Sequence, residues 1–410
     1  MYPYDLFFVQ QKIIKRGGEY VSVIVAAHIG DIHFGAFDTD ILLRELKHKF
    51  IKPMKKMPKL DVIFIEGDLY NHELSLNSKG AYNSFKFKEM LEEVAYKQSA
   101  KIRAIKGTKS HDFNQLKNLK FGNKVDFQVI NKVCKEKLFD DYKVLYLPEE
   151  YMKDPEEYYK DYLDVKDDYY DVIIGHGSFE ETSFNNFNSE SQISTAPIFN
   201  SKKICKICRG LISFGHIHDA VILRNQIYYT GSFSRWCYGE ENPKGFYFSL
   251  YNTETGHYKI VPVINTMART FITKNMTKYI LNNPIEKIIR KIEKLLYVDY
   301  VDNLRIKIKE INDKEFLTKL DILKNYFSSN NHIVIDIKKL NNISDDIEEE
   351  KELINKYSYL FEDLSVEEQS TRFINEEYGY EITKEKVEDI LNKDIIKLIN
   401  DEIYDGGENL

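Results

Sequence analysis

The stretch VSVIVAAHIGDIH, residues 21–33, begins as an apolar, β-branched run and ends in the polar residues Asp31 and His33. A short apolar run of this kind is typical of a strand buried on both faces. Residues i and i+2 of extended backbone point to the same side, so Asp31 and His33 could bind one ion. The stretch therefore predicts a buried strand, with His28 packed inside it and a candidate ligand pair at its carboxyl end.

Five further segments have the same apolar character and are predicted strands: 61–68, 101–107, 171–177, 211–218 and 226–233. The longer segments between them, such as 38–54 and 79–98, have the apolar spacing of amphipathic helices. Strands that alternate with helices along the chain indicate an α/β fold.

Chemically active residues recur where these strands end. The strand ends carry Gly67-Asp68, Gly107-Thr108-Lys109-Ser110-His111-Asp112, Gly175-His176-Gly177 and Gly215-His216-Ile217-His218. Ligands of open α/β sheets bind beyond the carboxyl ends of the strands, so we expect these side chains to meet. Imidazole and carboxylate together suit manganese, iron or zinc better than calcium. Two such ions could clamp the attacking and leaving oxygens of a phosphoryl group.

The character of the sequence changes after about residue 265. Segments 303–311 and 332–340 alternate apolar and polar residues like half-exposed strands, whereas 277–296 and 316–327 look helical. An acidic stretch then precedes further amphipathic segments. We therefore predict an N-terminal extension (1–20), a main domain (21–265), a small α+β domain (266–340), an acidic linker (341–354) and a helical tail (355–410).

Composition excludes some classes of protein. The 58 basic and 65 acidic residues give a net charge of -7, which argues against a globally basic nucleic-acid-binding protein. Bound cations and local basic clusters can still hold phosphates. The lone Cys205-x-x-Cys208 pair is a poor candidate for a zinc site, and we interpret these cysteines as reduced thiols. We find neither an apolar run of about 20 residues nor a signal peptide, and expect a cytoplasmic protein away from the membrane.

The order DxH, GD, SHD, GHG and GHxH, each after a predicted strand, resembles the calcineurin-like metallophosphoesterase superfamily. Within it, the chain resembles the SbcD-type DNA nuclease subunits, bacterial and phage relatives of the meiotic-recombination-eleven nuclease. Segment 228–248 is similar to that family's Gly-Ser, Arg, Glu and Lys-Gly-Phe region. The resemblance covers about residues 21–265, and beyond it only the domain order matches. It implies a four-layer αββα sandwich, a capping domain and a helical tail.

The resemblance also implies roles for individual residues. It places Asp31, His33 and His218 on a first metal, Asp68 as a bridge, His176 and His216 on a second metal, and His111 as the catalytic histidine. His111 would assist departure of the leaving oxygen or stabilise charge on the phosphate. Asp112 is expected to orient its neighbours or cap a helix. His72 is a candidate substrate contact. Arg235 either contacts substrate or braces the site, and simple packing is an equal alternative.

One motif departs from the family pattern. The family usually has GNHD, with the Asn on the second metal, whereas this chain has GTKSHD. The replacement ligand could be Ser110, Thr108 or a backbone carbonyl, or the amide of Asn114 or Gln115. Position favours Ser110. A neutral hydroxyl is a poorer ligand than an amide oxygen, so the second site could bind metal weakly.

The implied function is a Mn²⁺-dependent DNA exonuclease and endonuclease with two metal ions. It would act in repair, recombination or phage DNA processing, in the cytoplasm of a bacterium or phage-infected cell. Helices within 80–98 would form a homodimer, and tail helices at 355–403 would bind an SbcC-type coiled-coil ATPase in a heterotetramer. Packing of the tail on its own domain is an equal alternative. The competing functions are a small-molecule or cyclic-nucleotide phosphodiesterase and an inactive scaffold.

Overall fold

The computed structural model describes residues 23–36, 38–140, 142–152, 154–165, 169–183, 196–298, 301–309 and 311–338, together with Thr371 and 383–386. The predicted N-terminal extension and acidic linker lie outside the described residues, as does nearly all of the tail. The predictions made for those segments stay predictions.

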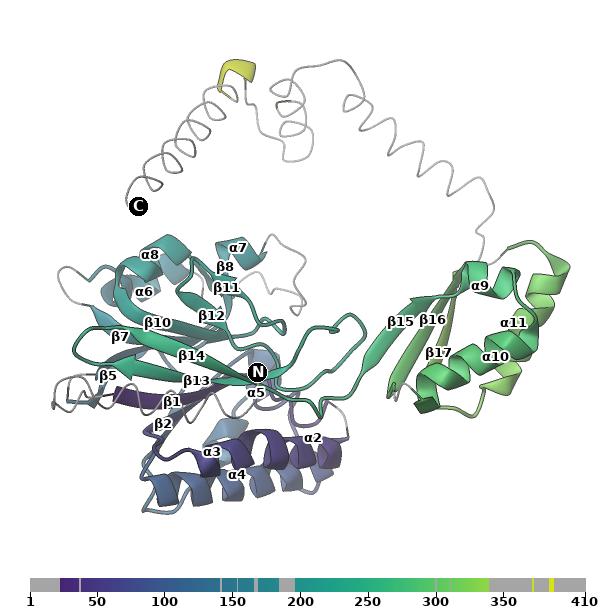
Figure 1. The fold of residues 1–410 in the computed structure, drawn as a ribbon. Coiled ribbons are helices and arrows are strands. Elements are labelled where there is room, and N and C mark those ends of the chain that lie inside the picture. Colours follow the sequence, from purple (N-terminus) through teal and green to yellow (C-terminus); the bar gives the residue numbers. More distant parts are fainter. Residues whose placement is uncertain are drawn as a thin grey trace, which may run out of the picture. The chain divides into compact units, whose positions relative to one another are not determined.

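The first of two six-stranded sheets contains the opening strand of the sequence (Figure 1). Its order is β14-β13-β1-β2-β3-β4, and β1 to β4 run parallel while β13 and β14 are antiparallel to their neighbours. The strands are β1 (Val23–Ile29), β2 (Val62–Glu66), β3 (Lys101–Ile105), β4 (Phe127–Ile130), β13 (Gly245–Asn252) and β14 (Tyr258–Ile264). The carboxyl ends of β1, β2 and β3 therefore lie at the same edge.

The second sheet has the order β11-β12-β10-β7-β6-β5. Its four central strands are parallel, and one antiparallel strand flanks them on each side. The strands are β5 (Cys134–Phe139), β6 (Tyr142–Leu147), β7 (Tyr170–His176), β10 (Cys208–Gly215), β11 (Ile222–Leu223) and β12 (Ile227–Tyr229). This sheet gathers the ends of β6, β7 and β10.

The two sheets pack face to face through a shared apolar core. The ring of Phe64 on β2 lies 6.4 Å from that of Tyr146 on β6, and Tyr251 on β13 lies 5.2 Å from Tyr142 on β6. Alternate residues of β2 point the other way, and Ile63 belongs to a separate core beneath the helices. This period of two explains why the buried strands are apolar throughout.

Helices cover the outer faces of both sheets (Figure 1). The first sheet is covered by α2 (Thr39–Leu46), a π-helical turn (Lys47–Ile51), α3 (Lys52–Lys56) and α4 (Lys79–Gln98). On α4, the ring centroid of Phe87 lies 5.8 Å from that of Phe34 and 6.1 Å from that of Phe50. The second sheet is covered by α6 (Pro155–Leu163) and α8 (Ser201–Lys206). The predicted mixed α/β class is therefore confirmed.

Smaller elements complete the described part of the chain. Short elements near the strand ends are α5 (Lys109–Asp112), a 3-10 turn (Gln115–Asn118), β8 (Ser178–Phe179), α7 (Glu180–Ser183) and β9 (Ile198–Phe199). A third sheet has the order β15-β16-β17, and its strands are β15 (Phe271–Asn275), β16 (Asn303–Lys309) and β17 (Ile333–Lys338). The helices that alternate with them are α9 (Thr277–Leu281), α10 (Ile285–Glu293) with a π-helical extension (Lys294–Val298), and α11 (Lys314–Tyr326). Segment 277–296, predicted as one helical stretch, divides where Pro284 caps α10.

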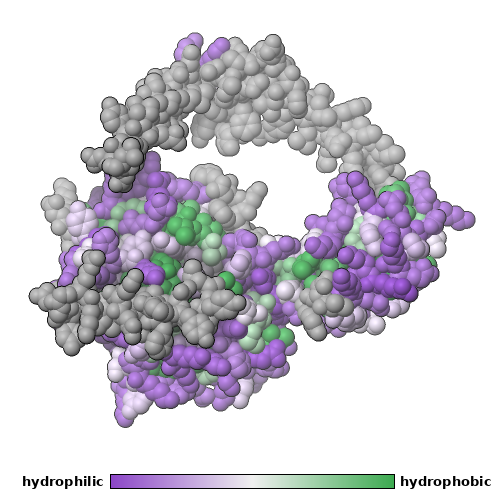
Figure 2. Space-filling view, in the orientation of Figure 1, coloured by the Kyte–Doolittle hydropathy of each residue, from purple (hydrophilic) through white to green (hydrophobic). Residues whose placement is uncertain are grey.

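Polar residues dominate the face shown in Figure 2, and the apolar residues on it form separate patches. No helix among the described residues has the length and apolar character needed to cross a membrane.

Candidate metal centre

The carboxyl ends of β1 and β2 in the first sheet and of β7 and β10 in the second sheet meet at one place. Backbone hydrogen bonds hold the segments that follow β1 and β2 together. The amide of Asp31 donates to the Gly67 carbonyl at 3.2 Å, and that of His33 donates to the Asp68 carbonyl at 3.0 Å. From β10, the amide of His216 donates to both carboxylate oxygens of Asp31 at 3.1 Å. The predicted ligands are therefore held in register by their own backbone.

Three overlapping groups of buried side chains could each hold a metal ion. They are Asp31, His33 and His218; His33, Asp68 and His111; and Asp68, His176 and His216. Within each group the potential ligand atoms lie within 4.8 Å of one another. His33 and Asp68 each belong to two groups, so the groups form one continuous cluster.

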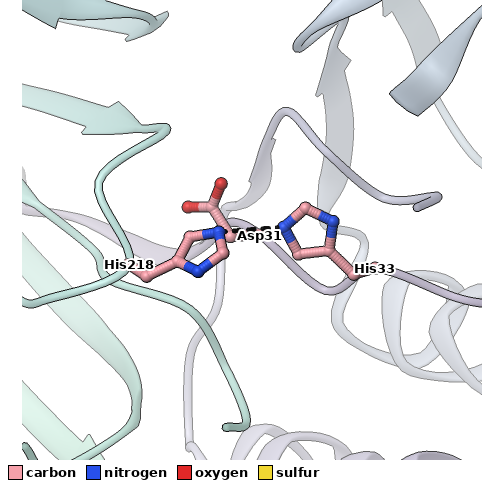
Figure 3. A group of neighbouring side chains, drawn as sticks. All are labelled: Asp31, His33 and His218. Carbon is pink, nitrogen blue, oxygen red and sulfur yellow. Dashed lines mark hydrogen bonds between the residues drawn. The ribbon is translucent and has the colours of Figure 1, made fainter. Parts of the chain in front are cut away.

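In the first group the imidazoles of His33 and His218 face each other beside the Asp31 carboxylate (Figure 3). Their Nε2 atoms are 3.1 Å apart. Two nitrogens at about 2.1 Å from one ion, a usual metal–imidazole distance, have this separation when the angle at the ion is roughly 95°. The spacing therefore suits two ligands of a single cation.

The other ring nitrogen of His218 is held by a buried carboxylate. Its Nδ1 lies 2.6 Å from Oε1 of Glu240, whose Oε2 accepts from the Trp236 amide at 2.7 Å. Buried Lys244 donates to the His218 carbonyl at 2.7 Å. A carboxylate at Nδ1 places the proton there and leaves the Nε2 lone pair facing the cluster. Glu240 and Lys244 therefore hold His218 in an orientation in which its Nε2 could bind a cation.

We predict that Glu240→Gln weakens binding of one cation by about 10- to 100-fold, the usual cost of losing such a carboxylate–histidine contact. An uncharged amide makes the imidazole less basic and no longer fixes its tautomer. Calorimetric titration of the metal-free protein with Mn²⁺ measures the change. The matched control is Glu241→Gln, because Glu241 is exposed and adjacent. Equal affinities for Glu240→Gln and the wild type would contradict the role given to Glu240.

The second group is arranged in a similar way. Nδ1 of His176 lies 2.7 Å from the Glu66 carbonyl, so it carries the proton and Nε2 faces Oδ2 of Asp68 at 3.3 Å. Burial opposes protonation of His176, but the adjacent Asp68 carboxylate outweighs it and raises the pKa of His176 well above its usual value. Burial tends to raise the pKa of Asp68, but the charge of His176 lowers it strongly. A cation at this position would replace the proton shared by this pair.

The pKa values of two further side chains, Asp31 and His216, show how strongly burial desolvates the cluster. Burial raises the pKa of Asp31 to about 6. Burial, followed by the charge of His176, lowers the pKa of His216 to about 3. A buried set that combines several carboxylates with imidazoles such as His216, whose pKa is lowered, favours a bound cation.

Four of the predicted ligands have a backbone conformation that is rare for residues with side chains. Their φ angles are 49° for Asp31, 56° for His33, 50° for Asp68 and 99° for His216. Such conformations cost of order 1–3 kcal/mol each and concentrate at functional sites. Their occurrence at the ends of three strands indicates that the backbone is shaped to position these side chains.

His111 lies in the middle group, and its ring centroid is 4.9 Å from that of His33. The next residue, Asp112, accepts hydrogen bonds from the amides of Asp68 at 3.1 Å, Tyr70 at 3.2 Å and Gly107 at 2.8 Å. Asp112 therefore fixes the backbone on which Asp68 and His111 sit, which is the orienting role predicted for it.

The structure does not bring Ser110, the favoured replacement ligand, into the cluster. Ser110 is exposed on α5, whereas buried Thr108 has its hydroxyl 3.1 Å from Oδ2 of Asp68 and 3.4 Å from Nε2 of His176. Asn114 is exposed, and the Gln115 amide is bound by the Leu74 amide and the His72 carbonyl. The exposure of Ser110 on α5, which begins at Lys109, weighs against the choice of Ser110, and the identity of the replacement ligand stays a prediction.

His72 and Arg235, the two candidate substrate contacts, lie outside the metal-binding groups. His72 is exposed, and its Nδ1 is 3.3 Å from the side-chain Nδ2 of Asn71. Arg235 donates to four backbone carbonyls, those of Ala268, Arg269, Glu241 and Asn242. These bonds match the bracing alternative for Arg235. Substrate contact by either residue stays a prediction.

Sequence reasoning missed Glu149. This residue is 3% exposed, and its Oε2 lies 3.6 Å from Nε2 of His176 and 3.5 Å from Nδ1 of His216. It follows β6, whose apolar run YKVLYL (142–147) was a usable signal, since an acidic residue after a buried strand matches the pattern of Asp68. Glu240 and Lys244 were noted only as features of segment 228–248.

Comparison with known proteins leaves the family open. No family model matches the chain, and no curated protein matches it. One solved crystal structure aligns with 59% of this chain and 100% of its own, at 13% identity and a TM-score of 0.33. A similarity of that size carries no argument about fold or function.

Proposed function

We propose that this protein is a metal-dependent phosphodiesterase with a calcineurin-like fold and two metal ions. The observation that carries this proposal is that Asp68 belongs to two of the three buried ligand groups. A carboxylate in that position suits a bridge between two cations. Two face-to-face sheets with helices on their outer faces also suit this fold, as does the order of motifs along the sequence.

The donor set fits two divalent cations. Asp31, His33 and His218 would hold one, and His176 and His216 the other, with Asp68 between them. The buried Nδ1 of His33 has no hydrogen-bond partner among the described residues. When bound, the cations would lower the pKa of a water molecule and neutralise charge on a phosphoryl group. Carboxylate and imidazole ligands are compatible with Mn²⁺.

The position of His111 supports a role in acting on the substrate. It belongs to the same buried group as Asp68 and His33, on the short helix α5 that Asp112 fixes. A protonated imidazole there would donate its proton to the departing oxygen of a phosphodiester. Its position in the cluster supports the role of catalytic histidine.

We propose DNA as the substrate, with exonuclease and endonuclease activity in repair, recombination or phage DNA processing. The resemblance of segment 228–248 to SbcD-type nucleases supports this choice. In the structure, Glu240 and Lys244 of that segment contact His218. The third sheet and its helices suit a capping domain. An SbcC-type ATPase and a homodimer are the proposed partners. On α4, Tyr82 and Tyr96 are 58% and 55% exposed, which suits a dimer contact.

The test compares end-labelled duplex DNA with bis-p-nitrophenyl phosphate, using the full chain with Mn²⁺ and with a chelator. We expect both substrates to be cleaved with Mn²⁺, neither with chelator, and DNA cleavage by His111→Ala to fall by about 10²- to 10⁴-fold, the usual contribution of general acid catalysis. The surface variant His48→Ala is the control. Cleavage of the small diester alone would indicate a small-molecule phosphodiesterase. Failure on both substrates, also after addition of an SbcC-type ATPase, would indicate a scaffold.

A further inference from the structure

We propose that Glu149 is a direct ligand of the second metal ion. This inference rests on the proposed two-metal site. It adds an anionic ligand that no sequence motif indicated, from the segment that follows β6 of the second sheet.

The distances are those of ligands around one ion. Oε2 of Glu149 lies 3.6 Å from Nε2 of His176 and 3.5 Å from Nδ1 of His216. Ligands at about 2.1 Å from a cation are separated by roughly 3.0–3.4 Å at octahedral to tetrahedral angles, and by roughly 3.5–3.6 Å when the angle between them opens to about 113–118°. Glu149 therefore meets both histidines at the separation expected for a shared cation.

The carboxylate is oriented before any ion binds. The hydroxyl of Tyr151 donates to Oε1 of Glu149 at 2.5 Å, and the amide of Lys109 donates to that Tyr151 hydroxyl at 3.4 Å. The hydroxyl of Thr108 donates to Oε2 at 3.2 Å. One oxygen is thus anchored by Tyr151, while the other faces the histidines. Hydrogen-bonded carboxylates of this kind are usual among metal ligands.

The charge of Glu149 also requires a partner. Its side chain is 2% exposed, and no Lys or Arg forms an ion pair with it anywhere in the described ranges. Burial of an isolated carboxylate is costly, and buried charges are normally paired or coordinate metals. The groups that face Oε2 are the imidazoles of His176 and His216 and the Thr108 hydroxyl. A divalent cation held by the same histidines would provide the missing charge.

This assignment changes the expected strength of the second site. A neutral hydroxyl from Ser110 would have made it weak. With Glu149, the second ion has two carboxylates, counting Asp68, and two imidazoles. Affinity for hard cations rises with the number of charged ligands. The second site should therefore bind Mn²⁺ without help from a hydroxyl ligand at Ser110.

The test is calorimetric titration of the metal-free full chain with Mn²⁺, without substrate. We expect two ions per wild-type chain. In Glu149→Gln one site should weaken by about tenfold or more, while the other changes less than about threefold. Glu150→Gln is the matched control, because Glu150 is adjacent and binds the Val133 amide and the Tyr158 hydroxyl instead. Ser110→Ala should bind both ions as the wild type does.

Two wild-type affinities retained in Glu149→Gln would overturn the proposal, as would fewer than two ions bound by the wild type. Circular dichroism of metal-free Glu149→Gln checks that it folds. If it does not, Tyr151→Phe is titrated in its place; it frees Oε1, and a second-site affinity unchanged within about threefold also overturns the proposal. A wild type that binds two ions yet cleaves no DNA, also after addition of an SbcC-type ATPase, would refute the proposed nuclease function and leave this inference standing.

Discussion

Asp68→Asn is expected to reduce Mn²⁺-dependent phosphodiester hydrolysis by about a thousandfold or more. Asp68 belongs to two ligand groups, so removal of its charge weakens both sites. Metal ions contribute several kcal/mol to stabilisation of a phosphoryl-transfer transition state, and about 4 kcal/mol corresponds to a thousandfold in rate. Asn has nearly the same size, and the backbone bonds from His33 to Asp68 and from Asp68 to Asp112 remain possible. The variant should therefore fold as the wild type does and lose most of its hydrolytic activity.

The measurement is the initial rate on bis-p-nitrophenyl phosphate at saturating Mn²⁺, with thermal unfolding recorded in parallel. Asp61→Asn is the matched control, because Asp61 lies just before the same strand β2 and its carboxylate binds the Val25 amide, far along the strand from the cluster. The control should keep its rate within about threefold. A rate for Asp68→Asn within tenfold of the wild type would rule out a bridging role.

The strand-end ligands could be predicted because their signal is local. An apolar run followed by Gly-Asp or Gly-His places the polar side chain beyond the carboxyl end of a strand, wherever that strand sits in a sheet. The position of Ser110 could not be predicted in this way. The structure of residues 107–112 depends on where α5 starts, and a start at Lys109 leaves Thr108 inside and Ser110 outside.

Glu149 and Glu240 could not be predicted because their positions depend on strand pairing. Leu147 on β6 pairs with Gly175 on β7, so the two residues that follow Leu147 continue beside His176 and Gly177. This neighbourhood joins segments more than 25 residues apart, and the sequence does not state which strands are neighbours. Glu240 lies in the long loop between β12 and β13 and reaches His218 only through the path of that loop.

The second large expected effect concerns Gly215, the last residue of β10. A Cβ atom there would lie 2.1 Å from the Glu66 carbonyl oxygen, 2.8 Å from Nδ1 of His176 and 3.3 Å from Oδ2 of Asp31. The first two distances are far inside van der Waals contact. The Glu66 carbonyl cannot move freely, because it accepts the hydrogen bond that fixes the tautomer of His176. Gly215 is therefore one of the residues that let the two sheets approach closely at the site.

We expect Gly215→Ala to lower the free energy of unfolding by about 3 kcal/mol, at the upper end of the usual cost of overpacking. Relief of the clash would displace either the Glu66 carbonyl or the His176 ring, so the second site should also lose affinity for Mn²⁺. Urea denaturation measures the first effect and calorimetric titration the second.

The control for this substitution is Gly122→Ala. A Cβ atom at Gly122 would meet only the carboxylate end of Glu92, at 2.7 Å, and that flexible side chain can move away. Gly122→Ala should therefore change the free energy of unfolding by less than about 1 kcal/mol. If Gly215→Ala were equally mild and kept both metal sites, the close approach of β10 to Glu66 would not be what positions His176. The geometry of the cluster would then have to depend on the strained residues at the ends of β1, β2 and β10.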